Sequence, residues 1–251
     1  MKTAAEYVES LRKLDRVVYM FGERIENVVD HPIIQPSMNA VAETYKLAGR
    51  PEFEDLMTAT SHLSGEKINR FTHIHQSVDD LVKKTKMGRL LGAQTGCCFQ
   101  RCVGMDAMNA LSMTTFDIDA KFGTPYNQRF IQFLKYVQKE DLTCDGAMTD
   151  PKGDRGLPPH QQKDPDLFLR IVEEREDGIV VRGAKAHQTG ALNSHEIIVM
   201  PTISMKEADQ NYAVSFAVPS DTDGLIYIMG RQSCDLRKAE GGDMDQGNLF
   251  F

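Results

Sequence analysis

The stretch LLGAQTGCCFQRCVGMD, residues 90–106, decides how the chain is interpreted, because three of the five cysteines fall within it. If the stretch is helical, Cys98 and Cys102 project from one face, one turn apart, while Cys97 points to the side. Two thiolates so placed are suited to bind one metal ion or part of an iron–sulfur cluster, and Arg101 beside them favours the thiolate form. The alternative is structural, since cysteine often packs as a small buried apolar residue. No further cysteine follows at a ferredoxin-like interval, so spacing alone leaves both interpretations open.

The composition is that of a globular protein with an acidic balance. The chain has 251 residues, 41% of them hydrophobic, which is enough for one large domain or two. A formal net charge of -7 without a dense basic run argues against nucleic acid as a partner. No apolar run approaches the roughly 20 residues of a membrane span, and the N-terminus lacks a signal-peptide core. We therefore expect no membrane association, a cytoplasmic location and reduced thiols.

Residues 1–140 have the pattern of a helical domain. Two capping boxes, in which a hydroxyl residue is followed three positions later by an acidic one, mark helix starts: Thr3 with Glu6, and Ser77 with Asp80. A stripe with helical spacing follows, made of Phe130, Phe133, Leu134 and Val137. We expect this stripe to face the core.

Residues 141–251 instead read as short strands. Asp177 and Gly178 form a turn signal between two β-rich runs, which predicts a hairpin. Further β-rich runs, bounded by proline and glycine, occupy residues 196–200, 212–218 and 225–229. Helices followed by strands predict an α+β fold: a helical domain, 1–140, that contains the C-x3-C helix, then a middle β domain, 141–251, with antiparallel strands.

The end of the chain is polar and glycine-rich at residues 238–248 and then apolar at residues 249–251. A sheet that stops there exposes unpaired strand edges. We therefore expect the β domain to be incomplete and to depend on a partner segment.

Two polar loops are candidates for binding a cofactor. The loop TDPKGDRG, residues 149–156, has glycines that free backbone N–H groups, and Lys152 and Arg155 add positive charge, so it can cradle a pyrophosphate. It matches neither a Walker loop nor a dinucleotide fingerprint, and a charged surface turn is the alternative. The second loop, residues 186–195, gathers hydrogen-bonding side chains after a strand. For His187 and His195 in this loop, a substrate role and a purely structural role stay open.

Four stretches together resemble the 4-hydroxybutyryl-CoA dehydratase family: VYMFGE (18–23), CFQRCVGMD (98–106), DGAMTDPKGDRG (145–156) and VRGAKAHQTG (181–190). The likeness runs along nearly the whole chain. That family uses FAD and a [4Fe-4S] cluster, is related to the large component of 4-hydroxyphenylacetate hydroxylase, and shares the acyl-CoA dehydrogenase-like fold. Its members are much longer, so the resemblance implies an N-terminal half.

The resemblance also implies site residues. Cys98 and Cys102 would be two of four cluster ligands, and the remaining ligands and the catalytic residues are expected beyond residue 251. The positions carried over as flavin contacts are Arg89, Met148, Thr149, Lys152, Asp154, Arg155, Gln188, Thr189 and Gly190.

The implied reaction is the radical dehydration of 4-hydroxybutyryl-CoA to crotonyl-CoA, with vinylacetyl-CoA isomerase activity, in a homotetramer. FAD would withdraw an electron transiently, and cluster iron would bind the leaving hydroxyl as a Lewis acid. The chain alone is expected to be inactive without the missing C-terminal half or a partner chain. Two alternatives remain. One is a flavin-dependent hydroxylase of the 4-hydroxyphenylacetate type, against which Cys98 and Cys102 argue; the other is a non-catalytic fragment that binds flavin or a partner.

Overall fold

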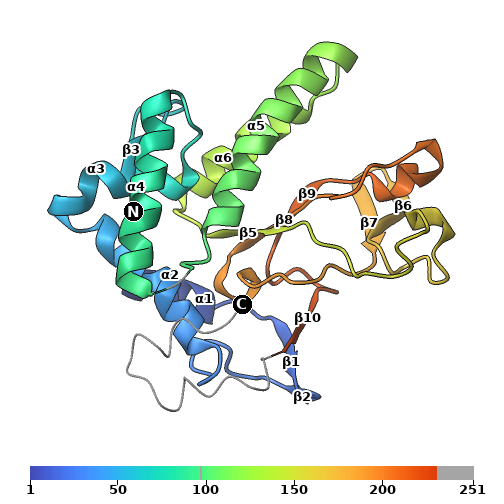
Figure 1. Cartoon of the computed structure of the whole chain (residues 1–251), viewed down its shortest axis with the longest axis horizontal. Helices are drawn as coiled ribbons and strands as arrows, with labels where there is room; N and C mark the ends of the chain where they lie inside the picture. The colour runs from blue at the N-terminus through green and yellow to red at the C-terminus, as the bar shows by residue number, and fades with distance from the viewer. Residues whose placement is uncertain (97, 231–251) are drawn as a thin grey trace.

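The computed structural model of the chain describes residues 1–96 and 98–230 (Figure 1). Cys97 and residues 231–251 lie outside the described residues. The prediction of unpaired strand edges at the end of the chain concerns this second range. The described helices are α1 (Ala4–Arg12), α2 (Gln35–Ala48), α3 (Glu54–Met57), α4 (Val78–Thr95), α5 (Cys102–Phe122) and α6 (Tyr126–Lys139). Across these residues, no helix is both long and apolar enough to span a membrane.

Both predicted capping boxes are confirmed. The Thr3 hydroxyl accepts the backbone N–H of Glu6 at 3.2 Å, and the Ser77 hydroxyl accepts that of Asp80 at 3.3 Å. In each case the acidic side chain accepts the N-cap backbone N–H in return. Helices α1 and α4 therefore begin where side-chain chemistry satisfies their first backbone donors.

The C-x3-C stretch is not one helix, which corrects the prediction. Helix α4 ends at Thr95, and Gly96 adopts a left-handed conformation with φ 69° while its N–H donates to the Gly92 carbonyl. Glycine tolerates this backbone conformation without steric cost, so it terminates the helix. Cys98 consequently lies in the connecting loop, and Cys102 is the first residue of α5.

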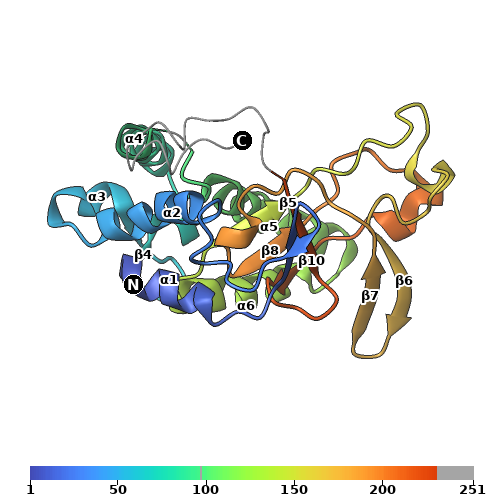
Figure 2. The ribbon, with the colours of Figure 1, turned by 90° about the horizontal axis from the view of Figure 1, so that it is seen from below.

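The strands form small sheets in which parallel and antiparallel pairs both occur. The strands are β1 (Val17–Met20), β2 (Glu23–Arg24), β3 (Thr58–Thr60), β4 (Lys67–Asn69), β5 (Cys144–Ala147), β6 (Arg170–Arg175), β7 (Gly178–Arg182), β8 (Glu196–Val199), β9 (Phe216–Pro219) and β10 (Ile226–Met229). One sheet has the order β5-β8-β9 and another β10-β1-β2. The predicted hairpin is confirmed as β6-β7, which projects at the opposite end of the molecule from α3 (Figure 2).

Helices followed by a small β region agree with the predicted fold class, but strand pairing differs from the expectation in two ways. Strand β5 pairs with β8 in parallel, and β1 pairs with β10 in parallel, so the β region is not antiparallel throughout. Strands β1 to β4 also lie within the first 140 residues, which we expected to be helical. Parallel pairs join segments separated by long connections, and a single local pattern does not encode them.

Helices α5 and α6 pack against strands β5 and β8 in one hydrophobic core. The predicted α6 stripe is confirmed, because Phe130, Leu134 and Val137 are buried in it and Phe133 is partly buried against it. Cys144 of β5 and Ile198 of β8 belong to the same core. This core fixes the first turns of α5 against the sheet, while the far end of α5 extends beyond the rest of the ribbon (Figure 1).

Helix α5 and strand β5 approach each other closely at two glycines. A Cβ added to Gly104 of α5 would lie 2.0 Å from the Cys144 carbonyl oxygen. A Cβ added to Gly146 of β5 would lie 2.4 Å from a Val103 methyl carbon. Both glycines are therefore required by close approach of a helix to a strand, and the approach places Cys102 beside β5.

We predict that Gly104→Ala destabilises the fold by roughly 3 kcal/mol, because overpacking at a backbone contact forces α5 away from β5. Gly88→Ala in α4 is the matched control, since nothing lies within 4 Å of its added Cβ. That control should be neutral or slightly stabilising, by about 0.5–1 kcal/mol. Urea unfolding followed by circular dichroism measures both, and equal stability of the two variants would contradict the packing described.

Candidate functional site

Cys98 and Cys102 lie together although they are on different elements. Their sulfur atoms are 3.9 Å apart, and both side chains are partly exposed, in contrast to Cys144, which is buried in the core. The backbone N–H of Gln100 donates to the Cys98 sulfur at 3.4 Å. Partial exposure argues against the purely structural interpretation of this pair, because packing cysteines are usually fully buried.

The two thiols have different acidities. The hydrogen bond from Cys102 and the backbone N–H of Gln100 lower the pKa of Cys98 to about 6, against the opposing effect of burial. The same sulfur–sulfur hydrogen bond and burial raise the pKa of Cys102. These hydrogen bonds, rather than the charge of Arg101, account for the shift at Cys98, so the expected role of Arg101 is corrected. Cys98 is therefore the more acidic thiol of the pair, and Cys102 keeps its proton as the hydrogen-bond donor to it.

The loop after β5 is held by one glutamine. Gln162 accepts the backbone N–H of Asp154 at 3.0 Å and donates to the carbonyls of Asp154 and Leu157 at 2.9 Å. The Lys152 and Arg155 side chains stay exposed. The loop is thus ordered and presents two cationic side chains outward, a suitable surface for a phosphate group.

A buried ion pair joins the start of this loop to the second polar loop. Lys185 contacts the Asp150 carboxylate at 2.6 Å and donates to the carbonyls of Met148 and Met200 at 3.1 and 2.9 Å. The side chains of Lys185 and Asp150 are only 11% and 7% exposed, so the pair is shielded from water. Sequence reasoning missed this pair, because only the fold brings the two residues together.

Further hydrogen bonds bring the predicted flavin positions of both loops together. The backbone N–H of Ala186 donates to the Thr149 carbonyl at 2.8 Å, and the Gln188 amide donates to the same carbonyl at 3.4 Å. Met148, Thr149 and Thr189 are exposed beside them. The structure therefore brings Met148, Thr149 and the 188–189 segment together, and their role as flavin contacts stays a prediction.

Gly190 connects this region to the cysteine loop. A Cβ at Gly190 would lie 2.8 Å from an Asp145 carboxylate oxygen and 3.1 Å from the Gln100 carbonyl oxygen. Gln100 is two residues from each of Cys98 and Cys102. The predicted flavin loops and the predicted metal ligands are thus neighbours in space. Arg89 lies exposed on α4, and no contact among the described residues draws it into this group.

Of the two histidines, His195 has a structural role. Its Nδ1 accepts the backbone N–H of Thr143 at 3.0 Å, and its Nε2 is 2.8 Å from the Ser10 hydroxyl. Burial, reinforced by nearby cationic side chains, lowers the pKa of His195 to about 3. It is therefore a neutral, hydrogen-bonded core residue. His187 is exposed and has φ 60°, and a substrate role for it stays a prediction.

Two buried carboxyl groups near the site carry no signal in the sequence. Burial raises the pKa of Asp145 to about 6 and that of Glu196 to about 7. Within the described residues, Asp145 Oδ2 has no hydrogen-bond partner, whereas Glu196 accepts the Tyr136 hydroxyl at 3.3 Å. A buried carboxyl of this kind keeps its proton to a higher pH than a solvated one.

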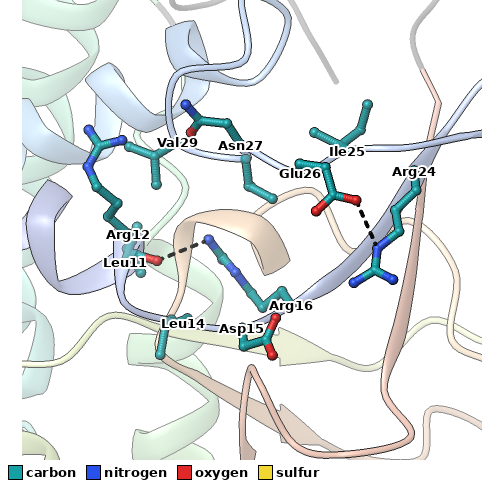
Figure 3. A pocket seen from close by; sticks show the side chains of 11 residues that line it. Leu11, Arg12, Leu14, Asp15, Arg16, Arg24, Ile25, Glu26, Asn27 and Val29 are labelled. Carbon is teal, nitrogen blue, oxygen red and sulfur yellow. Dashed lines mark hydrogen bonds and ion pairs between the residues drawn. The ribbon is translucent and has the colours of Figure 1, made fainter.

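The cavities do not coincide with the predicted site. One, of about 280 Å³, lies between the end of α1 with the loop that follows it and residues 24–29, and Arg12, Arg16 and Arg24 contribute to its lining (Figure 3). Another, of about 730 Å³, is lined partly by β3 and by Arg70, His73 and Asp80. In the part of the chain that is described, neither lining includes a residue carried over as a flavin or cluster contact.

The chain has helices packed on small mixed sheets, and two polar loops meet beside the start of a helix. This is the acyl-CoA dehydrogenase-like fold, and the similar solved structures have the same fold. A family model described as 4-hydroxyphenylacetate 3-hydroxylase N terminal matches residues 3–250. The chain belongs to this family.

Within the family, the chain is 67% identical, over its whole length, to 4-hydroxybutyryl-CoA dehydratase/vinylacetyl-CoA-Delta-isomerase of Clostridium aminobutyricum. A structure of the oxygen-tolerant archaeal 4-hydroxybutyryl-CoA dehydratase from N. maritimus superposes on 98% of this chain with a TM-score of 0.93 and 56% identity. The oxygenase component of 4-hydroxyphenylacetate 3-monooxygenase of Thermus thermophilus is more distant, at 27% identity over 90% of this chain.

The chain spans about half the length of these relatives. It covers 51% of the Clostridium protein, 46% of the Thermus protein and 50% of the archaeal structure. The predicted correspondence to an N-terminal half agrees with these matches and with the N-terminal family model.

We predict that the stability of the fold falls with rising pH through Asp145. The unfolded carboxyl ionises near its ordinary pKa of 3.8, while the folded one holds its proton to about 6, so the unfolded state binds fewer protons between these values. Asp145→Asn removes this effect. Between pH 4 and pH 7, the free energy of unfolding of the variant minus that of the unmodified chain should increase by about 2–3 kcal/mol.

Asp177→Asn, in the exposed β6–β7 turn, is the control for the chemical change and should keep a constant difference from the unmodified chain. Urea unfolding at several pH values measures all three proteins. If Asp145→Asn shows the same pH dependence as the unmodified chain, Asp145 ionises normally in the fold.

Proposed function

We propose that this chain forms the half of a dehydratase that binds FAD and supplies two iron ligands for the conversion of 4-hydroxybutyryl-CoA to crotonyl-CoA. The enzyme would be a lyase with vinylacetyl-CoA isomerase activity. The observation that carries the proposal is the adjacency of two partly exposed sulfurs to the joined polar loops through Gly190. Identity of 67% to a dehydratase/isomerase over the whole chain supports the choice of reaction.

The described residues fit FAD in part. The joined loops offer exposed hydroxyl groups at Thr149 and Thr189 and a half-buried amide at Gln188, which suit a flavin ring. Lys152 and Arg155 offer exposed positive charge on the same loop, which suits a pyrophosphate. When bound, FAD supplies reversible one-electron chemistry. The role of this chain is to fix both loops, through Lys185 and Gln162, so that the ring and the phosphates meet a preformed surface.

The donor set of the cysteine pair fits half of a [4Fe-4S] site. Iron–sulfur clusters are held by thiolates, and here two sulfurs are partly exposed and the pKa of one of them, Cys98, is lowered. Their separation of 3.9 Å is close to that of two thiolates on one tetrahedral metal, about 3.8 Å for bonds of about 2.3 Å. Ligands to separate irons stand farther apart, so Cys98, which lies on a loop, would turn away from Cys102.

The described residues hold no group of three or more possible ligands, so the other donors would come from elsewhere. We infer that they belong to the C-terminal half present in the relatives, supplied as part of a longer chain or by a partner chain. A cluster iron, when bound, supplies a Lewis acid for the leaving hydroxyl. Assembly as a homotetramer that acts on an acyl-CoA thioester is part of the same proposal.

A flavin-dependent aromatic hydroxylase is the second candidate. Membership of a family named for a 4-hydroxyphenylacetate hydroxylase favours it, and so does the fold. The hydroxylase relatives are less similar, however, at 26–31% identity for several of them, against 67% for the dehydratase. The cysteine pair also has no evident use in that reaction.

We predict that the chain forms an active enzyme with the C-terminal half of the Clostridium aminobutyricum dehydratase. The two polypeptides would be coexpressed, purified without oxygen, and reconstituted with FAD, iron and sulfide. Crotonyl-CoA should form from 4-hydroxybutyryl-CoA, and either polypeptide alone should be inactive. Replacing Cys98 by alanine should lower cluster content and remove more than about 99% of the activity, since loss of a ligand removes the Lewis acid.

Chemical analysis of flavin, iron and sulfide accompanies the activity assay. Flavin without iron, together with oxygen consumption that depends on 4-hydroxyphenylacetate, would instead support the hydroxylase. A complex that folds and assembles but binds neither cofactor would leave only a non-catalytic role.

A further inference from the structure

Arg101 stands between the two cysteines in the sequence, yet its side chain enters the core. It is only 2% exposed, and its guanidinium carbon lies 4.3 Å from the centre of the Tyr45 ring and 4.5 Å from that of the Phe71 ring. Its Nη1 donates to the Thr44 hydroxyl at 3.0 Å. The guanidinium is therefore held by helix α2 and by the short turn that contains Phe71.

We propose that Arg101 is the positioning residue that fixes the backbone between Cys98 and Cys102 and so keeps both sulfurs within reach of one bound group. It immediately precedes Cys102 and follows Cys98 by three residues, so anchoring its side chain fixes the backbone between the two sulfurs. The proposal rests on the proposed use of this pair as ligands. Arg101 acts through the backbone and through its own anchor in the core.

The rest of the loop is anchored around the same point. Phe99 packs on Phe71, with ring centres 5.5 Å apart, so Phe71 contacts both Arg101 and Phe99. Gln100 is buried, has φ 55°, and accepts a hydrogen bond from the Asn193 amide. Each of residues 99–101 is thus held by its own contact, and Cys98 and Cys102 lie at the two ends of this anchored segment.

We call Tyr45, Phe71 and Thr44, which hold the Arg101 guanidinium, the clamp. Its chemistry requires arginine. A planar guanidinium presents a face to each of two aromatic rings and still has N–H groups at its edge for a hydrogen bond. A lysine ammonium at the same place has the charge and N–H donors but no flat face to lie against the two rings. Among the described residues, Arg101 Nη2 has no partner, so stacking, rather than a full set of hydrogen bonds, holds the group.

A trivalent arsenical tests the position of the sulfurs without any cofactor. Phenylarsine oxide bonds to two thiols at once, and its oxygen leaves as water with the two thiol protons, so tight binding reports two sulfurs within reach of one arsenic atom. The assay would use the reduced chain with Cys97 and Cys234 replaced by serine, which leaves Cys144 buried in the core. Arg101→Lys should weaken binding by about ten-fold or more, because the effective concentration of the second thiol falls.

Arg16→Lys is the matched control. Arg16 is also a buried arginine, 5% exposed, and it donates to the Leu192 carbonyl at 2.6 Å, remote in sequence from the cysteines. This variant should bind the arsenical within about two-fold of the parent, because its two thiols keep their spacing. Circular dichroism confirms that each variant is folded, and reaction with a monofunctional maleimide confirms that each thiol remains accessible.

A folded Arg101→Lys chain that binds the arsenical like the parent would overturn the proposal. If that variant does not fold, Thr44→Val replaces it, since it removes only the hydrogen bond to Arg101 from this clamp and should weaken binding by about three-fold. Unchanged binding in a folded Thr44→Val chain would then overturn the proposal. Both results are independent of crotonyl-CoA formation, so failure of the proposed reaction would leave this test standing.

Discussion

The close approach of helix α5 to strand β5 is the constraint on which the rest of the structure depends. The helix backbone at Gly104 meets the Cys144 carbonyl, and the strand at Gly146 leaves room for the Val103 side chain, so neither glycine can carry a side chain of its own. Cys102 therefore begins its helix beside the strand that leads into the first polar loop. The buried α5–α6 core holds this contact, and helix and loop are placed relative to each other by packing rather than by surface charges.

Around this contact, two kinds of buried polar group determine the geometry of the site. The Lys185–Asp150 pair joins the two loops, and the clamped Arg101 fixes the segment between the cysteines. Buried charges are costly unless they are paired or stacked, so each group holds its surroundings in one arrangement. Thr149 and Thr189 are exposed and Gln188 is half-buried, and their buried neighbours keep all three in place for the proposed cofactor.

Local features were predictable from the sequence and long-range ones were not. The capping box at Thr3 and the hairpin turn at Asp177 depend on residues a few positions apart, and both are present. The break at Gly96 was missed because the helical spacing of the cysteines concealed a left-handed glycine cap. The parallel pairing of β1 with β10 joins segments more than 200 residues apart, and the short strand patterns carry no record of it. The raised pKa of Asp145 was missed because it results from burial, and the identity of one residue does not show whether that residue is buried.

The most direct test is an anomalous-difference map, measured at the iron absorption edge, from crystals of the chain reconstituted with the C-terminal half of the Clostridium aminobutyricum dehydratase, FAD, iron and sulfide. We expect iron bonded to the sulfurs of both Cys98 and Cys102, with the flavin ring against Thr149 and Gln188. Iron bound elsewhere while these two sulfurs remain within hydrogen-bonding distance of each other would contradict the account.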